Sequence, residues 1–434
     1  MNHVSDSLLE ALKAIAGEKN IIESGPRAEK FSKDFYWYSP ILKKQMDHLS
    51  AEVVVRVPDK EVLRQVIQLC VKNQIPVTPR GAGTGNYGQS IPLYGGVLVD
   101  FSKMDKIFAV QEGVAHVEPG ARLIKIETEA RAAGWELRCY PSTIVTASMG
   151  GFLCGGSGGI GSITWGGINN ADNVKSVTIM TAEEEPREIR FEERDSIQAL
   201  HTYGTTGFMI DIEMRLAPKK DYEQCIFVHE DWDHLLNWTD SIARQVDLPK
   251  RLVTLFQDQI PQYFTPIREH LPEKHHAAFF YVERSQVERL LESAEAKGIR
   301  HTLQIPYADP PKPPYITDYT WNHTTLWALK SDDSLTYLQS GFGSNFREQF
   351  KKLWEKFPGE ILFHLEWTVG NSKMESQAVR MTTGDDVLVG GLPIIRYKSP
   401  ERLQEIIDYC DEIGVFTANP HTCILEEGGK HPDI

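Results

Sequence analysis

The sequence is poor in the features that mark secreted, membrane-spanning and nucleic-acid-binding proteins. Its six cysteines lie singly, without paired short spacings, which predicts reduced thiols and neither a disulfide framework nor a zinc site. No apolar run is long enough to span a bilayer, and no basic segment followed by an apolar core opens the chain. We therefore expect a cytoplasmic protein, with a peripheral association with a membrane as the alternative. The formal net charge of −14, without a long basic run, disfavours nucleic acid as a partner.

Length and polarity predict more than one domain. At about 150 residues per domain, a chain of 434 residues corresponds to two or three domains that each bury a core. The polar segment Pro218-Lys219-Lys220 follows a strand pattern of alternating apolar and charged residues over 210–216. Beyond it, helical and strand patterns alternate, which predicts an antiparallel sheet covered by helices on one face. We place the domain boundary near residue 220.

A glycine-rich loop follows a short apolar run at Ile75 to Val77. The loop reads Arg80-Gly81-Ala82-Gly83-Thr84-Gly85, and glycines of this density let backbone N–H groups crowd toward an anion. No helical period follows, which weakens a nicotinamide-type dinucleotide fold, and no Gly-Lys-Ser/Thr follows, which excludes a nucleoside-triphosphate loop. The loop predicts a site for a phosphate or pyrophosphate.

Two further glycine-rich blocks follow the first. One runs from Pro141 through Gly150-Gly151 to Gly159, and its glycine content predicts extended backbone in place of a core helix. Few of its residues are charged, so we expect ordered, buried backbone that can lie flat against a large planar ligand. The other block is Gly204-Thr205-Thr206-Gly207-Phe208-Met209-Ile210.

These three blocks, in this order and spacing, resemble the FAD-linked oxidase superfamily of vanillyl-alcohol oxidase and p-cresol methylhydroxylase (PCMH). The glycolate oxidase and D-lactate dehydrogenase branch is the most similar. The resemblance implies an α+β fold. A PCMH-type FAD-binding domain of two subdomains would occupy residues 1–220, with its core at 47–218, and an α+β cap domain with an antiparallel sheet would occupy residues 221–434. The cap would close the substrate pocket above the flavin.

The resemblance also assigns the cofactor contacts. By this assignment the first block holds the FAD pyrophosphate, the second passes the ribityl chain and the flavin ring, and the third presents backbone to the flavin. The implied cofactor-binding residues are Pro79, Arg80, Gly81, Ala82, Gly83, Thr84, Gly85, Pro141, Ser142, Ala147, Ser148, Gly150, Gly151, Gly207, Met209 and Ile210. The histidine and cysteine that tether flavin in some members have no counterpart in 83–85 or 144–149, so we expect non-covalent FAD.

The catalytic residues should come from the cap. Oxidation of an alcohol carbon requires a base for the hydroxyl proton, for which histidine or tyrosine is suited, and a 2-hydroxy acid also requires a cation for its carboxylate. We expect His421 and Arg396 in these roles, with His364 and His323 as the next candidates; a hydrogen-bonded core residue is at least as good an interpretation of His364. The other cap candidates are Tyr319, Trp321, Asn322, Trp327, Lys330, Glu366, Asn371, Tyr397, Lys398, Asn419 and Glu426.

Two family features are missing from the cap sequence. Many hydroxy-acid members carry a metal-binding His-x-Gly-Asp-Gly-Asn-x-His stretch, whereas the corresponding strand here reads Phe363-His364-Leu365-Glu366-Trp367, so we predict no metal site. The Asn-Pro-Gly-Lys segment near the flavin is also absent; the only Asn-Pro is Asn419-Pro420, which would place His421 near that position or indicate a truncated end.

The resemblance implies an oxidoreductase that transfers a hydride from a small hydroxylated substrate to FAD. A 2-hydroxy acid such as glycolate or D-lactate is the first expectation, and a phenolic or sugar alcohol is the alternative. A non-catalytic flavin-binding subunit of a larger oxidase, or a flavin reductase with a nicotinamide donor, are the competing functions. The electron acceptor, whether a quinone, an electron carrier or oxygen, stays open, as do a homodimer and oxidase-complex subunits as partners.

Overall fold

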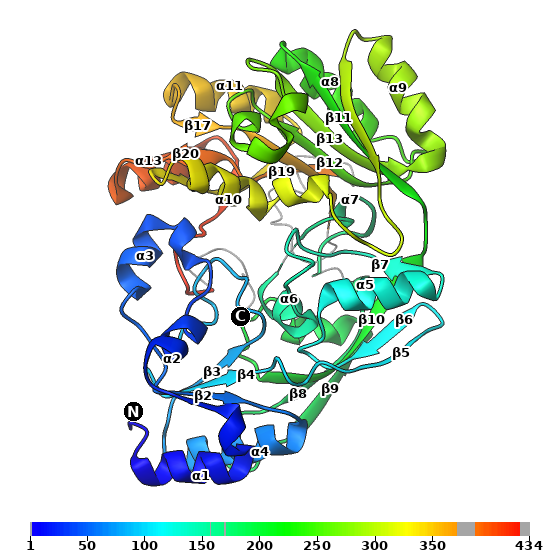
Figure 1. Ribbon diagram of the computed structural model, residues 1–434. Coiled ribbons are helices and arrows are strands. Elements are labelled where there is room, and N and C mark those ends of the chain that lie inside the picture. Colours follow the sequence, from blue (N-terminus) through cyan, green and yellow to red (C-terminus); the bar gives the residue numbers. More distant parts are fainter. Residues whose placement is uncertain (1, 157, 169–170, 371–386, 426–434) are drawn as a thin grey trace.

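The protein folds into two halves that are stacked along the long axis of the molecule. The computed structural model describes residues 2–156, 158–168, 171–370 and 387–425. In Figure 1 the N-terminal half, blue to green, lies below, and the C-terminal half, green to red, lies above it. No strand is shared between the sheets of 21–218 and those of 222–418 within the part of the chain that the structure describes.

The first subdomain is a four-stranded sheet with helices packed against both of its faces. The order is β1-β2-β4-β3, with β2, β4 and β3 parallel and β1 antiparallel to β2. The side chain of Asp59 accepts the N–H groups of Glu61 and Val62 and so begins α4, whose apolar face packs on the sheet. Its elements are α1 (Asp6–Ala16), β1 (Ile21–Glu23), α2 (Pro26–Phe31), α3 (Pro40–Met46), β2 (Val53–Arg56), α4 (Lys60–Lys72), β3 (Val77–Arg80) and β4 (Val97–Asp100).

The second subdomain is an antiparallel sheet in the order β5-β6-β10-β8-β9, with β7 also paired to β10. The alternation predicted for 210–216 is present in β10, where Ile212 and Met214 are fully buried. Its elements are β5 (Ile107–Gln111), β6 (Val114–Val117), α5 (Leu123–Ala132), β7 (Trp135–Leu137), α6 (Met149–Gly155), α7 (Ser162–Trp165), β8 (Val174–Met180), β9 (Glu188–Glu192) and β10 (Phe208–Pro218).

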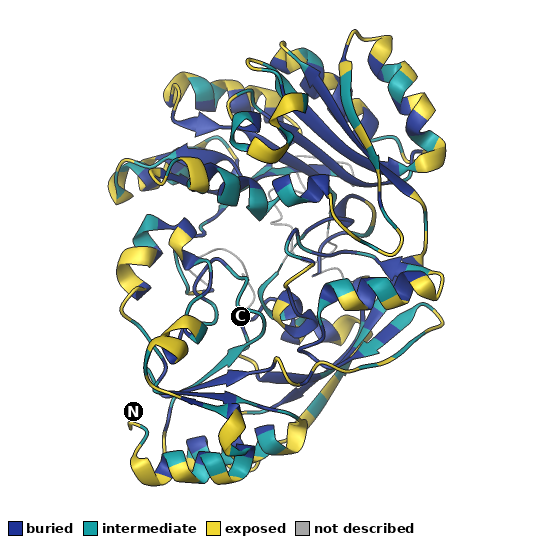
Figure 2. Ribbon diagram, in the orientation of Figure 1, coloured by how far each residue is buried: buried dark blue, intermediate teal, exposed yellow. Residues whose placement is uncertain are grey.

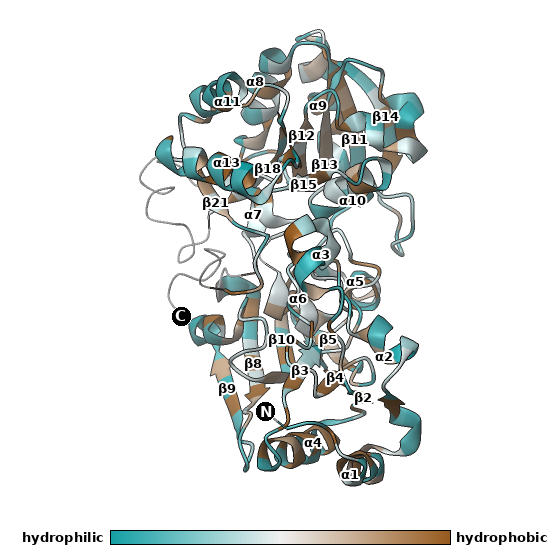
Figure 3. Ribbon diagram, turned by 90° about the vertical axis from the view of Figure 1, so that its left-hand side faces the viewer, coloured by the Kyte–Doolittle hydropathy of each residue, from teal (hydrophilic) through white to brown (hydrophobic). Residues whose placement is uncertain are grey.

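The C-terminal half is built on an eight-stranded sheet in the order β14-β11-β13-β12-β18-β19-β16-β21, and every pair in it is antiparallel. Helices α8, α9, α11 and α13 bury their apolar faces against one side of it, as Figures 2 and 3 show by burial and by hydropathy. The expected antiparallel α+β architecture of this half is confirmed. Its sheet strands are β11 (Tyr222–His229), β12 (Lys250–Phe256), β13 (His276–Glu283), β14 (Arg300–Pro306), β16 (Gln339–Phe342), β18 (His364–Val369), β19 (Val387–Gly391) and β21 (Phe416–Ala418).

A small three-stranded sheet and several helices make up the rest of the C-terminal half within the ranges that the structure describes. The segment 361–369 is divided between two sheets, because β17 joins the small sheet β15-β20-β17 while β18 joins the large one. These elements are α8 (Trp232–Ala243), α9 (Val287–Glu295), α10 (Asn322–Ser331), β15 (Leu335–Tyr337), α11 (Phe346–Lys356), β17 (Ile361–Leu362), β20 (Ile394–Arg396) and α13 (Pro400–Glu412).

Buried charges join the two halves. The guanidinium of Arg251 on β12 is 2% exposed and lies 3.6 Å from Glu127 on α5 and 3.7 Å from Glu136 on β7. The hydroxyl of Tyr222 on β11 donates to Glu136 over 2.8 Å. Because an unpaired charge is costly away from water, this network fixes the halves against each other. None of the helices in the described ranges is long and apolar enough to cross a membrane.

Candidate active site between the two halves

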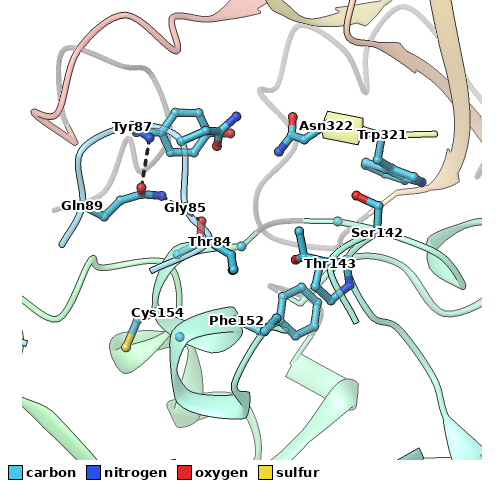
Figure 4. Close-up of a pocket in the computed structure, with 18 of the residues that line it drawn as sticks. Thr84, Gly85, Tyr87, Gln89, Ser142, Thr143, Phe152, Cys154, Trp321 and Asn322 are labelled. Carbon is cyan, nitrogen blue, oxygen red and sulfur yellow. Dashed lines mark hydrogen bonds between the residues drawn. The ribbon is translucent and has the colours of Figure 1, made fainter. Parts of the chain in front are cut away.

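A cavity of about 440 Å³ lies where the two halves meet, and all three glycine-rich blocks line it. Figure 4 shows how its walls face one another. Trp321 and Asn322 reach in from the C-terminal half, opposite Ser142 and Thr143 and the first glycine-rich block at Thr84 and Gly85. The structure thus brings together segments that are more than 200 residues apart in the sequence.

The first block begins where β3 ends at Arg80. The Arg80 guanidinium donates to the backbone carbonyl of Lys33 over 2.7 Å and so anchors the loop at one end. Gly83 has a φ of +66°, in the left-handed region that favours glycine. The next regular element among the described residues is β4, not a helix, so the loop does not lead into a helix as it does in a nicotinamide-binding fold.

The second block lies directly against the first. A β-carbon added to Gly81 would be 2.6 Å from Ser148 Oγ and 3.0 Å from Gly151 Cα, so only glycine permits this approach. The expectation that this block contains no core helix is wrong, because Met149 to Gly155 forms the short helix α6. Its buried residues Met149, Phe152 and Leu153 supply packing that offsets the low helix propensity of its glycines.

Fifteen of the sixteen residues expected at the cofactor line this cavity, and Ile210 does not. Ile210 projects from β10 into the core of the first subdomain, whereas its neighbour Met209 faces the other way and lines the cavity. The period of two along a strand explains this difference. Phe208, at the start of the strand, belongs to the same core as Ile210 and also borders the cavity. The side chain of Ile210 does not line the cavity, and the expected backbone contact of this block with the cofactor stays a prediction.

The sequence reasoning missed several lining residues. Asp34, Tyr87, Gln89 and Tyr203 all contribute to the walls. The segment Asn86 to Gln89 continues the phosphate loop directly, and Tyr203 directly precedes the third block, so proximity in sequence was an available signal. Asp34 had no such signal. Its Oδ1 accepts the N–H of Tyr36 over 2.8 Å, and burial raises its pKa to about 7.

On the cap side, Glu366 of β18 is the centre of a buried hydrogen-bond cluster. Its carboxylate accepts the backbone N–H of Trp321 over 2.9 Å and the hydroxyl of Thr254 over 2.5 Å, and His364 Nε2 lies 2.9 Å from it. Glu366 is 1% exposed and lines the cavity, while His364 lies behind it and does not. Trp321, which precedes α10, has a φ of +53°, a strained conformation for a non-glycine residue. The bond to Glu366 holds this backbone in place.

Of the four histidine and arginine residues expected to be catalytic, only His323 lines the cavity. Burial is the largest of the effects that lower the pKa of His323 to about 4, so its imidazole is neutral at pH 7. His364 is fully buried and stacks on Phe256 with ring centroids 4.8 Å apart. His364 thus has the surroundings of a hydrogen-bonded core residue, and its partner is the carboxylate of Glu366 in the cavity wall.

The structure does not bring Arg396 or His421 to this cavity. Arg396 ends β20 of the small sheet, donates to Gly359 O over 3.1 Å and to Gln259 Oε1 over 2.9 Å, and is 41% exposed. His421 is buried, with Nε2 donating to the Tyr337 carbonyl over 2.9 Å and Nδ1 2.7 Å from Ser39 Oγ. This histidine ties the end of the described chain to the start of α3, so we no longer assign it to the chemistry.

The other cap candidates divide between the cavity and the surroundings. Trp321, Asn322 and Glu366 line it, and Asn371 and Glu426 lie outside the described residues. Those that lie elsewhere are Tyr319, Trp327, Lys330, Tyr397, Lys398 and Asn419. Within the described ranges, no group of three or more histidine, cysteine, aspartate or glutamate side chains is arranged to hold a metal ion.

Known proteins resemble this chain both in sequence and in structure. Residues 51–190 match the family model described as an FAD binding domain. The chain is 26% identical over 184 residues to a D-lactate dehydrogenase of Anaerostipes hadrus, covering 42% of this chain and 37% of that protein. It is 27% identical over 192 residues to the glycolate oxidase subunit GlcD of Escherichia coli K12, covering 41% of this chain and 38% of that protein. The chain thus spans less than half the length of these curated relatives.

A solved structure of alkyldihydroxyacetonephosphate synthase resembles the whole fold. Its TM-score is 0.72 at 14% sequence identity, and the superposition covers 95% of this chain and 82% of that one. At this identity the likeness concerns the fold alone. It extends over both halves, so the stacking of a two-subdomain half and a sheet-and-helix half is shared between the two proteins.

Proposed function

We propose, from the premise that residues 51–190 form an FAD-binding domain, that the chain is an FAD-dependent oxidoreductase acting on a CH–OH group. One observation carries the proposal: a single cavity joins the three glycine-rich blocks of that domain to a cap wall that holds a buried carboxylate. We further propose that residues 1–220 act as the FAD domain and residues 221–434 as the cap. The cofactor of the domain is FAD, a flavin.

The residues of the cavity fit this cofactor. The close contact of Gly81 with Ser148 and Gly151 makes a cradle of bare backbone, suited to a pyrophosphate and a flat ring. Ser148 Oγ and Asp34 Oδ2 are buried without a hydrogen-bond partner among the described residues, as expected of groups that await a polar ligand. When bound, FAD supplies an acceptor for a hydride from the substrate. We propose that it is held without a covalent bond, so acid denaturation should release it.

Glu366 is our proposed acceptor for the hydroxyl proton of the substrate. A general base must lie within hydrogen-bond reach of the proton that it removes, and Glu366 is the cavity carboxylate on the cap wall. His364, Thr254 and the Trp321 N–H fix its orientation from three sides. His364 is thus a positioning residue, and the neutral imidazole of His323 is the second candidate for the base.

Two substrate classes follow from different observations. The names of the relatives, D-lactate dehydrogenase and glycolate oxidase subunit, support a 2-hydroxy acid as the substrate of this chain. The carboxylate of Glu366 on the cap wall favours an uncharged alcohol. A non-catalytic role within a larger oxidase is supported by the word "subunit" in the name of one relative, and a cavity with both a cofactor cradle and a buried carboxylate opposes it.

The test is reduction of the bound flavin by candidate substrates. The purified chain, loaded with FAD, would be mixed without oxygen with D- and L-2-hydroxy acids, with aryl and sugar alcohols, and with NADPH as the control for a reductase. Loss of the flavin absorption near 450 nm with an alcohol, about 10² times faster than with NADPH, supports the proposal. Failure of every alcohol to reduce the flavin, in a protein that retains FAD, would leave the non-catalytic role.

Electron acceptors, including a quinone and oxygen, would then be compared by reoxidation of the reduced protein. We propose a cytoplasmic location, with membrane association tested by fractionation.

A further inference from the structure

The register of the cap sheet defines which residues face the cavity. Directly paired residues on neighbouring strands point to the same side of a sheet. Thr254 pairs with Glu366, Glu366 with Gly390, Gly390 with Gly341, and Gly341 with Phe416. These five residues form one row across five strands, on the side opposite the helices, and the last four line the cavity.

Two positions in the middle of this row have no side chain. Between the carboxylate of Glu366 and the ring of Phe416 stand only Gly390 and Gly341, and we call this gap the glycine lane. Neighbouring strands are about 4.8 Å apart, so the strands of Glu366 and Phe416, three steps apart, are separated by about 14 Å. The lane is therefore wide enough for a ring with a substituent.

The glycine at position 390 is not required by its own backbone. Its φ does not lie in the left-handed region, and a β-carbon there would have its nearest neighbours at 3.5 Å from Ser340 O and 3.6 Å from Glu366 O, an ordinary contact. In the interior of a strand glycine weakens the sheet, and one common reason for it is the close approach of a ligand. The packing of the protein thus leaves room for a side chain that the sequence does not supply.

The lane has both apolar and polar sides. Leu388, two residues before Gly390 on β19, and Leu392, just beyond the end of that strand, line the cavity. Thr368, which pairs with Leu388, and Gln339, two residues before Gly341, also line it and are polar. Phe416 closes one end with an aromatic ring, and Glu366 closes the other with an acceptor for a hydrogen bond. An occupant of this lane would therefore be flat where it crosses Gly390 and Gly341, with a hydrogen-bond donor at the Glu366 end.

The charge at the Glu366 end favours a donor over a second anion. A helix N-terminus attracts negative charge, and Glu366 itself accepts the N–H of Trp321 at the start of α10. The carboxylate of the protein thus occupies the place that a substrate carboxylate would take at this helix. His323, which also lines the cavity at this helix, has a pKa lowered chiefly by burial and carries no charge at pH 7 to compensate a substrate anion.

We infer that the glycine lane is the substrate subsite, and that it selects an uncharged, ring-bearing alcohol whose hydroxyl donates to Glu366 while its ring lies across Gly390 and Gly341. The inference rests on the proposed function, because the lane is a substrate subsite only if the cavity holds FAD. Gly390 and Gly341 are then specificity-determining residues, and a small 2-hydroxy acid is disfavoured at this position.

The experiment measures binding, without turnover, to the FAD-loaded protein. Phenol has a ring and a hydroxyl but no oxidisable carbon beside the hydroxyl, benzoate has the same ring with a carboxylate, and oxamate resembles a 2-hydroxy acid. Each is titrated while the absorption of the bound flavin is recorded. We expect phenol to bind at least tenfold more tightly than benzoate or oxamate, and Glu366→Gln to reduce that preference.

Substitutions within the lane test its location. Gly390→Leu should weaken phenol at least tenfold, and Gly390→Ala, whose β-carbon fits at ordinary contact distances, should weaken it less. Both variants should retain one FAD per chain and the melting temperature of the parent protein; if Gly390→Leu fails to fold, Gly390→Ala carries the test. The inference is overturned if oxamate or benzoate binds more tightly than phenol, or if phenol does not bind. It is also overturned if the phenol affinity is unchanged in whichever Gly390 variant folds. Absence of bound FAD in the parent protein, or of flavin reduction by any alcohol, counts instead against the proposed function.

Discussion

The contact between the two glycine-rich blocks makes Gly81→Ala the most direct test of the cofactor cradle. The added β-carbon would lie 2.6 Å from Ser148 Oγ, 3.0 Å from Gly151 Cα and 3.3 Å from Gly151 N. Ser148 is a side chain and can rotate away, whereas Gly151 is backbone at the start of α6. The two blocks must therefore separate by a few tenths of an ångström.

Overpacking of this kind costs about 1–3 kcal/mol. If the cost falls on the geometry that holds the cofactor, it corresponds to FAD binding that is about 5- to 150-fold weaker. The assay is titration of the FAD-free protein with FAD, followed by flavin fluorescence and by the melting temperature of the loaded protein.

Gly155→Ala is the matched control. Gly155 lines the same cavity, but a β-carbon there would meet its nearest atom, the Gln89 amide nitrogen, at 3.4 Å. We expect its FAD affinity to stay within about threefold of the parent, less than 1 kcal/mol. If Gly81→Ala binds FAD as tightly as Gly155→Ala does, the two blocks do not form the cradle.

Three further predictions concern buried charges. Glu366→Gln should slow flavin reduction by about 10²- to 10⁴-fold with FAD content unchanged, and a parent-like rate in stopped-flow measurements would remove Glu366 as the base. Burial raises the pKa of Asp34 to about 7 from 3.8, so the folded protein holds this proton more tightly than the unfolded chain does, and the carboxyl lowers stability as pH rises from about 4 to 7. Asp34→Asn should remove that decline and stabilise the FAD-free protein at pH 8 by up to about 4 kcal/mol, and a pH profile of urea unfolding that keeps its slope would refute this. Arg251→Met removes one of the two buried guanidinium groups that face Glu127 and Glu136, the other being Arg131, and should cost about 3–5 kcal/mol in urea unfolding. The exposed Arg289, bonded to Asp247, serves as the control, for which the same change should cost less than about 1 kcal/mol.

The cap shows where prediction from sequence fails. A guanidinium and an imidazole suit the chemistry, yet Arg396 lies on the small sheet and His421 is bonded to Ser39 and Tyr337. Glu366 was only one of several candidates, because a glutamate in an apolar strand has no local mark of its function. Its role depends on Thr254, His364 and Trp321, which come from two strands and the start of a helix.

The sequence by itself determined the cofactor half of the site. A left-handed φ at Gly83 and a backbone contact at Gly81 are local demands that only glycine meets, so the residue types alone are enough to indicate the loop. The order of the cap strands was decided only by the tertiary structure. Strands β18, β19, β16 and β21 come from separate parts of the sequence. A shift of one residue in the pairing of a strand would turn its residue of the glycine lane to the face of the sheet away from the cavity. Because that register depends on long-range packing, no local pattern could place Glu366, Gly390 and Phe416 in one row.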